Sequence, residues 1–167
     1  MTLLKNNEVT ENTWRAVSDK DEISGEFSGE DSVIISLEHW TEEKENFAGR
    51  NGALGLHLES HEKPEAIADD VDQFDLISLD FPALPDGRAF SYARLLRERY
   101  GFKGELRAVG KVIQDQLFFM KRCGFDSFEL SDGEDVEKSI AALSAFSVAY
   151  QPAADDIKPA YNARHVG

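Results

Sequence analysis

The chain has 167 residues, close to the usual size of one domain, and 41% of them are hydrophobic, which is too many for a disordered protein. Its formal net charge of -14 argues against a nucleic-acid binder, because such proteins need cations to displace counterions from phosphates. No apolar run reaches the ~18 residues of a membrane-spanning helix, and no export signal is visible at the N-terminus. We therefore expect a cytoplasmic protein with neither a membrane nor a nucleic-acid partner.

The charge is unevenly distributed along the chain. Residues 1–80 hold 20 acidic and 6 basic residues, whereas residues 81–130 hold 6 acidic and 9 basic ones. A basic block in an acidic chain can receive an anion or an acidic partner, although it can also be an ordinary solvated helix surface. We expect the functional surface in this central block, residues 79–130.

Residues 1–32 are polar and predict no more than an edge strand or a hairpin, near residues 14–23. Short apolar runs then alternate with helical patterns up to residue 152. Strands are predicted at 33–37, 53–59, 74–81, 105–110, 127–131 and 148–152. Helices are predicted at 38–48, 63–71, 86–100, 111–123 and 134–147. Residues 153–167 read as a loosely ordered tail.

This alternation of strands and helices predicts a single α/β domain with a mostly parallel sheet built from repeated βα units. Two architectures fit the pattern, an open doubly wound sheet and a partial (β/α) barrel. Both place ligand sites at the carboxyl ends of the strands, and the sequence does not choose between them.

The helix predicted at 86–100 opens with an unusual arrangement of charge. Asp86 is a good N-cap, and Gly87 allows close backbone approach. Arg88 follows in the first turn, where a cation opposes the helix dipole, so that a bound anion would offset the conflict. Arg94 and Arg97 lie one turn apart on nearly the same face. The predicted anion-binding residues are Asp86, Gly87, Arg88, Arg94, Arg97 and Arg107.

Arg107 lies inside a predicted strand. If its side chain faces inward it must be paired, because an isolated buried charge is very costly, and Asp80 and Asp115 are plausible partners. Such a polar cluster near the strand ends could be structural or catalytic. The candidate catalytic residues are Asp80, Arg88, Arg107 and Asp115.

The helix predicted at 111–123 carries two adjacent phenylalanines. Phe118 and Phe119 cannot both face the core from a helix that is covered on one side, so one of them is expected to pack outward. With Arg122 they form a predicted interface for a partner or for a second copy of the chain, unless the helix is covered on two sides within the fold. Cys123 is interpreted as a small buried hydrophobe.

Both strong helices end on predicted glycine C-caps. Gly101 and Gly124 follow the last helical residues, and Phe102 and Phe125 are placed to pack back on the preceding turns.

Several chemistries lack their sequence signatures. There is no GxGxxG fingerprint after a strand, no GxxxxGK[ST] loop and no GxSxG elbow. A lone cysteine forms neither an internal disulfide nor a redox CxxC pair, and the four histidines lack metal-site spacing. No cofactor and no metal are implied by any motif.

The stretch DFPALPDGRAFSYARLLRERYGFKGELRAVGKVIQDQLFFMKRCGFDSFEL, residues 80–130, resembles the core of a bacterial domain-of-unknown-function family. Members of that family are described as oxidoreductases involved in sulfite reduction. The shared pattern is approximately FPxxxDGR, SxARxLR, GELRAxG, DQLFF and RCGFDxF. It covers roughly the central third of the chain, and the N-terminal eighty residues and the tail carry little of it.

This resemblance implies an accessory protein of assimilatory sulfite reduction, on the route from sulfate to cysteine biosynthesis. The implied partner is sulfite reductase or another sulfate-assimilation enzyme, because members are encoded near these enzymes. Sulfite is a small dianion near neutral pH, and arginines at a helix N-terminus are suited to such a ligand. The alternatives are a cofactor-dependent oxidoreductase and a non-catalytic scaffold protein.

Overall fold

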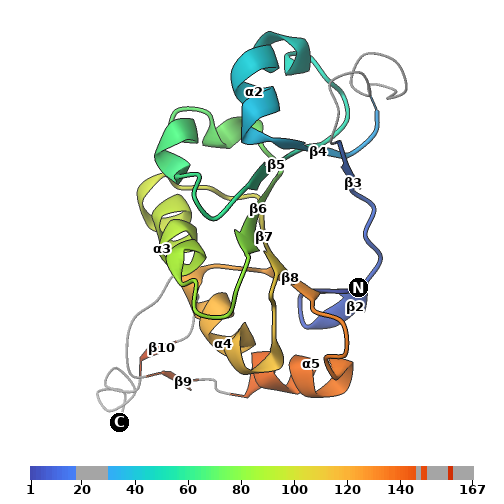
Figure 1. Cartoon of the computed structure of the whole chain (residues 1–167), viewed down its shortest axis with the longest axis vertical. Coiled ribbons are helices and arrows are strands. Elements are labelled where there is room, and N and C mark those ends of the chain that lie inside the picture. The colour runs from blue at the N-terminus through green and yellow to red at the C-terminus, as the bar shows by residue number, and fades with distance from the viewer. Residues whose placement is uncertain (18–29, 146–147, 150–157, 160–167) are drawn as a thin grey trace.

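An eight-stranded sheet runs through the computed structural model, which describes residues 1–17, 30–145, 148–149 and 158–159 (Figure 1). Six parallel strands follow chain order across it, and two antiparallel strands complete one edge, so the order is β2-β1-β8-β7-β6-β5-β4-β3. The parallel strands are β3 (Arg15–Ala16), β4 (Val33–Ser36), β5 (Leu54–Leu58), β6 (Leu76–Phe81), β7 (Glu105–Gly110) and β8 (Ser127–Leu130). The predicted α/β class with a mostly parallel sheet is confirmed.

The helices and turns connect successive strands. The helices are α2 (Leu37–Glu43), α3 (Arg88–Arg94), α4 (Gln114–Cys123) and α5 (Val136–Ser144). The short turns are η1 (Lys44–Phe47), η2 (Pro64–Ile67) and η3 (Val71–Gln73), and a π-helical segment, η4 (Leu95–Arg99), continues α3. The helix predicted at 63–71 is thus two separate 3₁₀ turns. A separate parallel pair consists of β9 (Val148–Ala149) and β10 (Lys158–Pro159).

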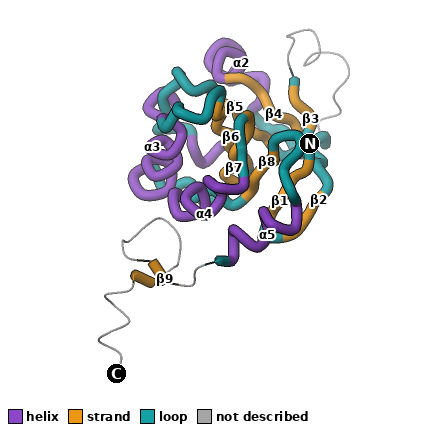
Figure 2. The backbone as a smooth tube through the Cα atoms, turned by 60° about the horizontal axis from the view of Figure 1, so that its bottom comes forward, coloured by secondary structure: helices purple, strands orange, loops and turns teal. Residues whose placement is uncertain are grey.

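The strand order decides between the two predicted architectures. Parallel strands that follow one another without a reversal, joined by right-handed crossovers, keep their helices on one face. Helices α2, α3 and α4 accordingly lie along one side of the sheet (Figure 2). The sheet curls into a half-barrel around the other side, so the partial barrel is correct and the doubly wound sheet is wrong.

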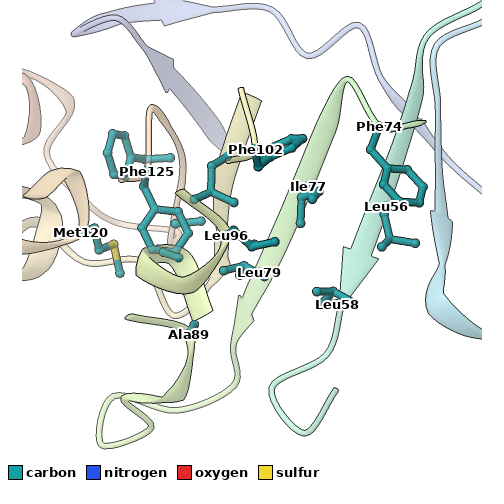
Figure 3. Packing of buried hydrophobic residues seen from close by; sticks show 14 of the residues in the cluster. Leu56, Leu58, Phe74, Ile77, Leu79, Ala89, Leu96, Phe102, Met120 and Phe125 are labelled. Atoms are coloured by element: carbon teal, nitrogen blue, oxygen red, sulfur yellow. The ribbon is translucent and has the colours of Figure 1, made fainter. Parts of the chain in front are cut away.

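The main core fills the space between the convex face of the sheet and the helices. Alternate residues of the central strands, including Leu56, Ile77 and Leu79, are fully or almost fully buried there. Figure 3 shows Ile77 and Leu79 on the side of β6 that faces Leu96 of the helix after it. This layer is apolar on every central strand, which leaves the concave face to carry the polar residues.

The predicted glycine caps are confirmed. Gly101 and Gly124 adopt φ angles of 68° and 114°, where only glycine avoids steric strain. The amide of Phe102 donates to the carbonyl of Leu96 at 2.9 Å, and both Phe102 and Phe125 are buried against their helices.

The N-terminal residues contribute more structure than the sequence predicted. β1 (Thr2–Lys5) and β2 (Glu8–Thr10) form a hairpin whose turn residues, Asn6 and Asn7, have φ angles of 54° and 64°. Two successive positive φ angles are typical of a type I′ turn, whose twist matches that of the strands. β1 pairs antiparallel with β8, and β3 forms the opposite edge of the sheet.

Two predicted segments lie largely outside the described residues. Residues 18–23 of the predicted N-terminal edge strand are not described. In the predicted tail, β10 is the only described part. Among the described helices, none combines the length and the apolar character that crossing a bilayer would require.

Truncation of Leu4 tests whether β1 is an integral strand of the domain. Leu4 is fully buried, so Leu4→Ala should lower the free energy of unfolding in urea by about 3 kcal/mol, through lost burial and the cavity left behind. The matched control, Val9→Ala on β2, removes a side chain that is 58% exposed and should cost less than about 1 kcal/mol. Equal effects of the two substitutions would contradict the observed position of β1.

Candidate functional site

A continuous polar layer crosses the concave face of the half-barrel. Neighbours in this layer occupy matched positions on adjacent strands, because the sheet register pairs each with the next. Its members, from β4 across to β1, are Ser36, His57, Ser78, Arg107, Ser127 and Lys5. Interior layers of a closed barrel are normally filled by branched apolar side chains. A polar layer at this position is therefore typical of a surface that binds something.

A buried ion network occupies the β7 end of this layer. Arg107 is 2% exposed, and its Nε and Nη2 atoms donate to Oε1 of Glu105 at 3.0 and 2.7 Å. Ser127 Oγ donates to the same oxygen at 2.7 Å, and Lys5 Nζ donates to Oε2 at 2.6 Å. Burial disfavours the ionised form of Glu105, but these donors outweigh it and hold the pKa of Glu105 below its ordinary value. The carboxylate therefore binds two cations and a hydroxyl group.

His57 and Ser78 form the centre of the layer. Nδ1 of His57 lies 2.9 Å from Oγ of Ser78, which fixes the imidazole ring on the concave face. Asp80 lies two residues farther along β6, toward its carboxyl end. Burial raises the pKa of Asp80; His57 acts in the opposite direction, and the carboxylates of Glu59 and Asp86 add to the rise.

The segment between β2 and β3 crosses the concave side and closes a pocket against the polar layer. In Figure 1 this segment runs along the side of the sheet away from α3 and α4. The side-chain oxygen of Asn12 accepts hydrogen bonds from the amide of Trp14 and from Nη1 of Arg107, both at 3.1 Å. The Trp14 ring comes close to Gly55, where a Cβ atom would lie 3.2 Å from it.

This pocket, which is partly open to solvent, has a volume of about 430 Å³. This is within the size range of small-molecule sites, which combine apolar walls with a few convergent polar groups. Its lining residues are Asn12, Trp14, Ala16, Val17, Ile34, Ile35, Ser36, His57, Ser78, Arg107, Val109 and Glu129. We take this pocket as the candidate site.

Arg88 lies at the carboxyl-end rim of the sheet, outside the pocket lining. Its Nε and Nη2 atoms donate to the two oxygens of Asp86 at 3.0 and 2.6 Å, and Nη2 also donates to Oγ of Ser60 at 2.9 Å. Hydrogen bonds from Arg88 hold the pKa of Asp86 at about 2. Asp86 also accepts from the amide of Arg88, as expected of a capping residue, although the N-cap position itself belongs to Gly87.

The predicted anion-binding arginines do not form one cluster. Arg97 donates to the backbone carbonyls of Phe102, Gly104 and Gly124 and to Asp126, which places it at the amino ends of β7 and β8. Arg94 is half-buried on α3. Arg107 lies on the concave face, and Arg88 at the opposite end of the strands from Arg97. Anion binding by any one of these residues stays a prediction.

The prediction that Asp80 or Asp115 pairs with Arg107 was wrong. Glu105 pairs with Arg107 because two residues along a strand bring side chains to the same face. Asp80 shares the concave face with Arg107 but lies beside Val109 in the register. Asp115 is exposed in the first turn of α4, on the helix side of the sheet. Of the four candidate catalytic residues, the structure brings only Asp80 and Arg107 to one face.

The predicted interface residues point in different directions. Phe119 is 50% exposed, Phe118 is partly buried and Arg122 is buried. Phe119 therefore projects outward, while Arg122 does not reach the outer surface of α4. Cys123 is fully buried, as predicted for a small hydrophobe.

A second pocket of about 530 Å³ lies at the amino end of β5, next to α2. Its acidic residue Asp70 accepts hydrogen bonds from Trp40 and Lys44. The amino-terminal face of such a fold usually serves stability, so we do not assign it a function. Within the described ranges, no three His, Cys, Asp or Glu side chains are grouped to hold a metal ion.

The sequence does carry a signal for the pocket, beyond the predictions above. Polar residues recur at every second position of three successive strands, in the pairs Ser78 and Asp80, Glu105 and Arg107, and Ser127 and Glu129. A period of two indicates one polar face per strand, whereas strands of a doubly wound sheet are apolar on both faces. Trp14 and Asn12 carried no such signal, because their role depends on the path of the loop.

Comparison with models of known families identifies the family of the chain. The model of a family described as bacterial proteins of unknown function, DUF934, matches residues 55–161, which is well over half of the chain. The matched region includes His57, Ser78, Arg107 and Glu129. It does not include Asn12 and Trp14, which precede it in the chain. No curated protein matches the chain.

Substitution of Glu105 tests the buried ion network. Glu105→Gln leaves the charge of Arg107 buried without a carboxylate and should lower the unfolding free energy by about 3 kcal/mol at pH 7. Because the pKa of Glu105 is depressed in the folded state, its contribution is complete above pH 4.5 and is lost as the pH falls through the folded pKa. Urea unfolding between pH 7 and pH 3 should therefore show the two proteins converging in acid.

The matched control is Glu129→Gln on the next strand. Glu129 makes no ion pair or hydrogen bond with the described residues, so this substitution should change stability by less than about 0.5 kcal/mol. If the difference in unfolding free energy between wild type and Glu105→Gln does not become smaller in acid, the role given to Glu105 is contradicted.

Proposed function

Since the chain belongs to the DUF934 family of bacterial proteins, we propose that it is an accessory protein of assimilatory sulfite reduction. In this role it binds sulfite reductase or another enzyme on the route from sulfate to cysteine. The pathway is supported by the resemblance of residues 80–130 to proteins described as acting in sulfite reduction. The mode of action is supported by one surface feature, the exposed phenylalanine of α4.

Phe119 is the outermost ring of an aromatic series that begins in the core. Phe125 packs on Phe81 with ring centroids 5.7 Å apart, Phe81 on Phe90 at 5.0 Å, and Phe90 on Phe119 at 4.9 Å. The ring of Phe119 is thus held in place by α3 although half of it faces solvent. A fixed, exposed aromatic side chain is the usual anchor of a protein interface, because little conformational entropy is lost when a partner covers it.

The charge balance of the central block favours a protein partner with acidic character. Helices α3 and α4 belong to the central block, which holds 9 basic and 6 acidic residues in a chain of net charge -14. This difference in sign would orient an acidic partner toward the part of the molecule that contains α3 and α4. The exposed Phe119 then marks the α3–α4 face, meaning Phe90, Phe119 and the residues around them. We therefore place the docking surface for sulfite reductase on this face.

The burial of the Cys123 thiol favours an accessory role over independent redox chemistry. Cys123, the single cysteine, is fully buried in the core behind α4, so it cannot exchange with an external disulfide without local opening. The sequence also lacks a dinucleotide fingerprint. The oxidoreductase alternative has no comparable feature in its favour.

Deletion of the gene in its bacterial host tests the pathway. The deletion strain should grow with sulfide as sole sulfur source and should grow poorly with sulfite or sulfate, because only the step that forms sulfide is affected. Wild-type protein supplied from a plasmid should restore growth on sulfite. Equal growth of the deletion strain on all three sources would overturn the proposal.

Substitution of Phe119 tests the surface. Phe119→Ser should reduce retention of sulfite reductase on the immobilised protein about tenfold, because a buried aromatic anchor carries a large share of interface energy. The same variant should fail to restore growth on sulfite. Val9→Ser, which changes a side chain 58% exposed on β2, is the matched control and should behave as wild type. Equal retention by both variants would exclude the α3–α4 face.

A further inference from the structure

The concave pocket presents two opposite charges that do not meet. Arg107 and Glu129 both line it, from the neighbouring strands β7 and β8. The described ion pairs join Arg107 to Glu105 and leave Glu129 without one. A cation and an anion that face one cavity without contacting each other are complementary to a ligand that carries both signs.

Arg107 retains hydrogen-bonding capacity after its protein contacts are counted. A guanidinium group has five N–H donors, and Arg107 uses three of them, two on Glu105 and one on Asn12. Two N–H groups are left over among the described contacts. Because planar guanidinium groups match carboxylates well, the free donors favour a carboxylate on the ligand.

His57 and Ser78 can contribute to the same end of the ligand. Nδ1 of His57 is engaged with Oγ of Ser78, which leaves the other ring nitrogen for the pocket. Both residues line the cavity; Ser78 is next to Arg107 in the register and His57 is next to Ser78. The carboxylate end of the pocket is therefore the polar layer at β5 to β7.

Glu129 supplies the opposite charge. It lines the cavity, is only partly exposed, and forms no hydrogen bond with the described residues. Burying this carboxylate under a purely anionic ligand would be costly, because two like charges would then share one pocket. An ammonium group on the ligand removes that cost.

The remaining walls are apolar. Trp14 approaches from the segment that crosses the concave face, and Val17 follows β3. Ile34 and Ile35 come from β4, three strands away from Arg107 on β7. They offer contact to a hydrocarbon group at the end of the pocket away from the charges. The volume of about 430 Å³ is sufficient for a molecule of amino-acid size with a branched side chain.

We propose that the concave pocket binds a free α-amino acid with an apolar side chain, its carboxylate at Arg107 and its ammonium group at Glu129. This inference is independent of the docking role of the α3–α4 face. It gives the protein a small-molecule site on the side of the sheet opposite to the partner-binding surface.

The two tryptophans make the test specific. Trp14 lines the concave pocket, whereas Trp40 lines the second pocket and donates to Asp70 at 3.0 Å. In ¹H–¹⁵N spectra of the full chain, L-leucine should shift the indole signal of Trp14 in a saturable way and leave that of Trp40 unchanged. Trp14→Phe assigns the two signals.

Two derivatives of the probe separate the charges. N-acetyl-L-leucine lacks the ammonium group and L-leucinamide lacks the carboxylate, and each should bind at least about tenfold more weakly than L-leucine, because each loses a charge-assisted hydrogen bond. Equal binding of N-acetyl-L-leucine would show a simple anion site and overturn the proposal. No shift of the Trp14 signal with L-leucine at tens of millimolar would overturn it as well.

Glu129→Gln provides the matched variant, because Glu129 contributes no described ion pair to the fold. It should weaken L-leucine about tenfold and leave the weak binding of N-acetyl-L-leucine unchanged, since that derivative has no cation to lose a partner. Val109→Phe, which fills the cavity without removing a charged group, should abolish the shift. Unaltered L-leucine binding by both variants would place the ligand elsewhere and overturn the assignment.

Discussion

The connection between the two edge strands constrains the whole fold. β2 ends at Thr10 and β3 begins at Arg15, so five virtual bonds of ~3.8 Å, at most about 19 Å, must join opposite edges of the sheet. Eight flat strands spaced ~4.8 Å apart would separate those edges by roughly 34 Å. The sheet must therefore curl, and the connecting segment necessarily lies across the hollow that the curl creates. The concave pocket, with Asn12 and Trp14 on one wall, follows from this geometry.

The polar layer inside the hollow is expensive for the fold. Replacing a buried ion network by well-packed apolar residues is often neutral or stabilises a protein by about 1–4 kcal/mol. The network of Glu105, Arg107 and Lys5 thus contributes less to stability than an apolar layer could. Both carboxylate oxygens of Glu105 accept hydrogen bonds, and these contacts offset the burial of Arg107, which is 2% exposed. Such an arrangement is more readily explained by a ligand than by folding.

The sequence predicted the parts of the fold that depend on local patterns. The β7 boundaries, 105–110, and the caps at Gly101 and Gly124 follow from periodicity and from glycine chemistry. Features that depend on distant pairing were missed: β1 reads as a four-residue fragment until β8 is placed beside it. The architecture and the Glu105–Arg107 pair are intermediate cases. The alternation of polar and apolar residues along the strands indicates both, but only if the polar faces of neighbouring strands are recognised as one shared face.

The position of β1 gives the molecule an order of assembly. Lys5 leaves the ribosome before Glu105, which it contacts and which is synthesised 100 positions later. The parallel units from β4 to β8 can form progressively during translation, because each packs on its predecessor. The opening hairpin has no neighbour until the last parallel strand emerges. The hollow is consequently finished only after β8 has been made, and a product that stops before β8 would present it without Glu129.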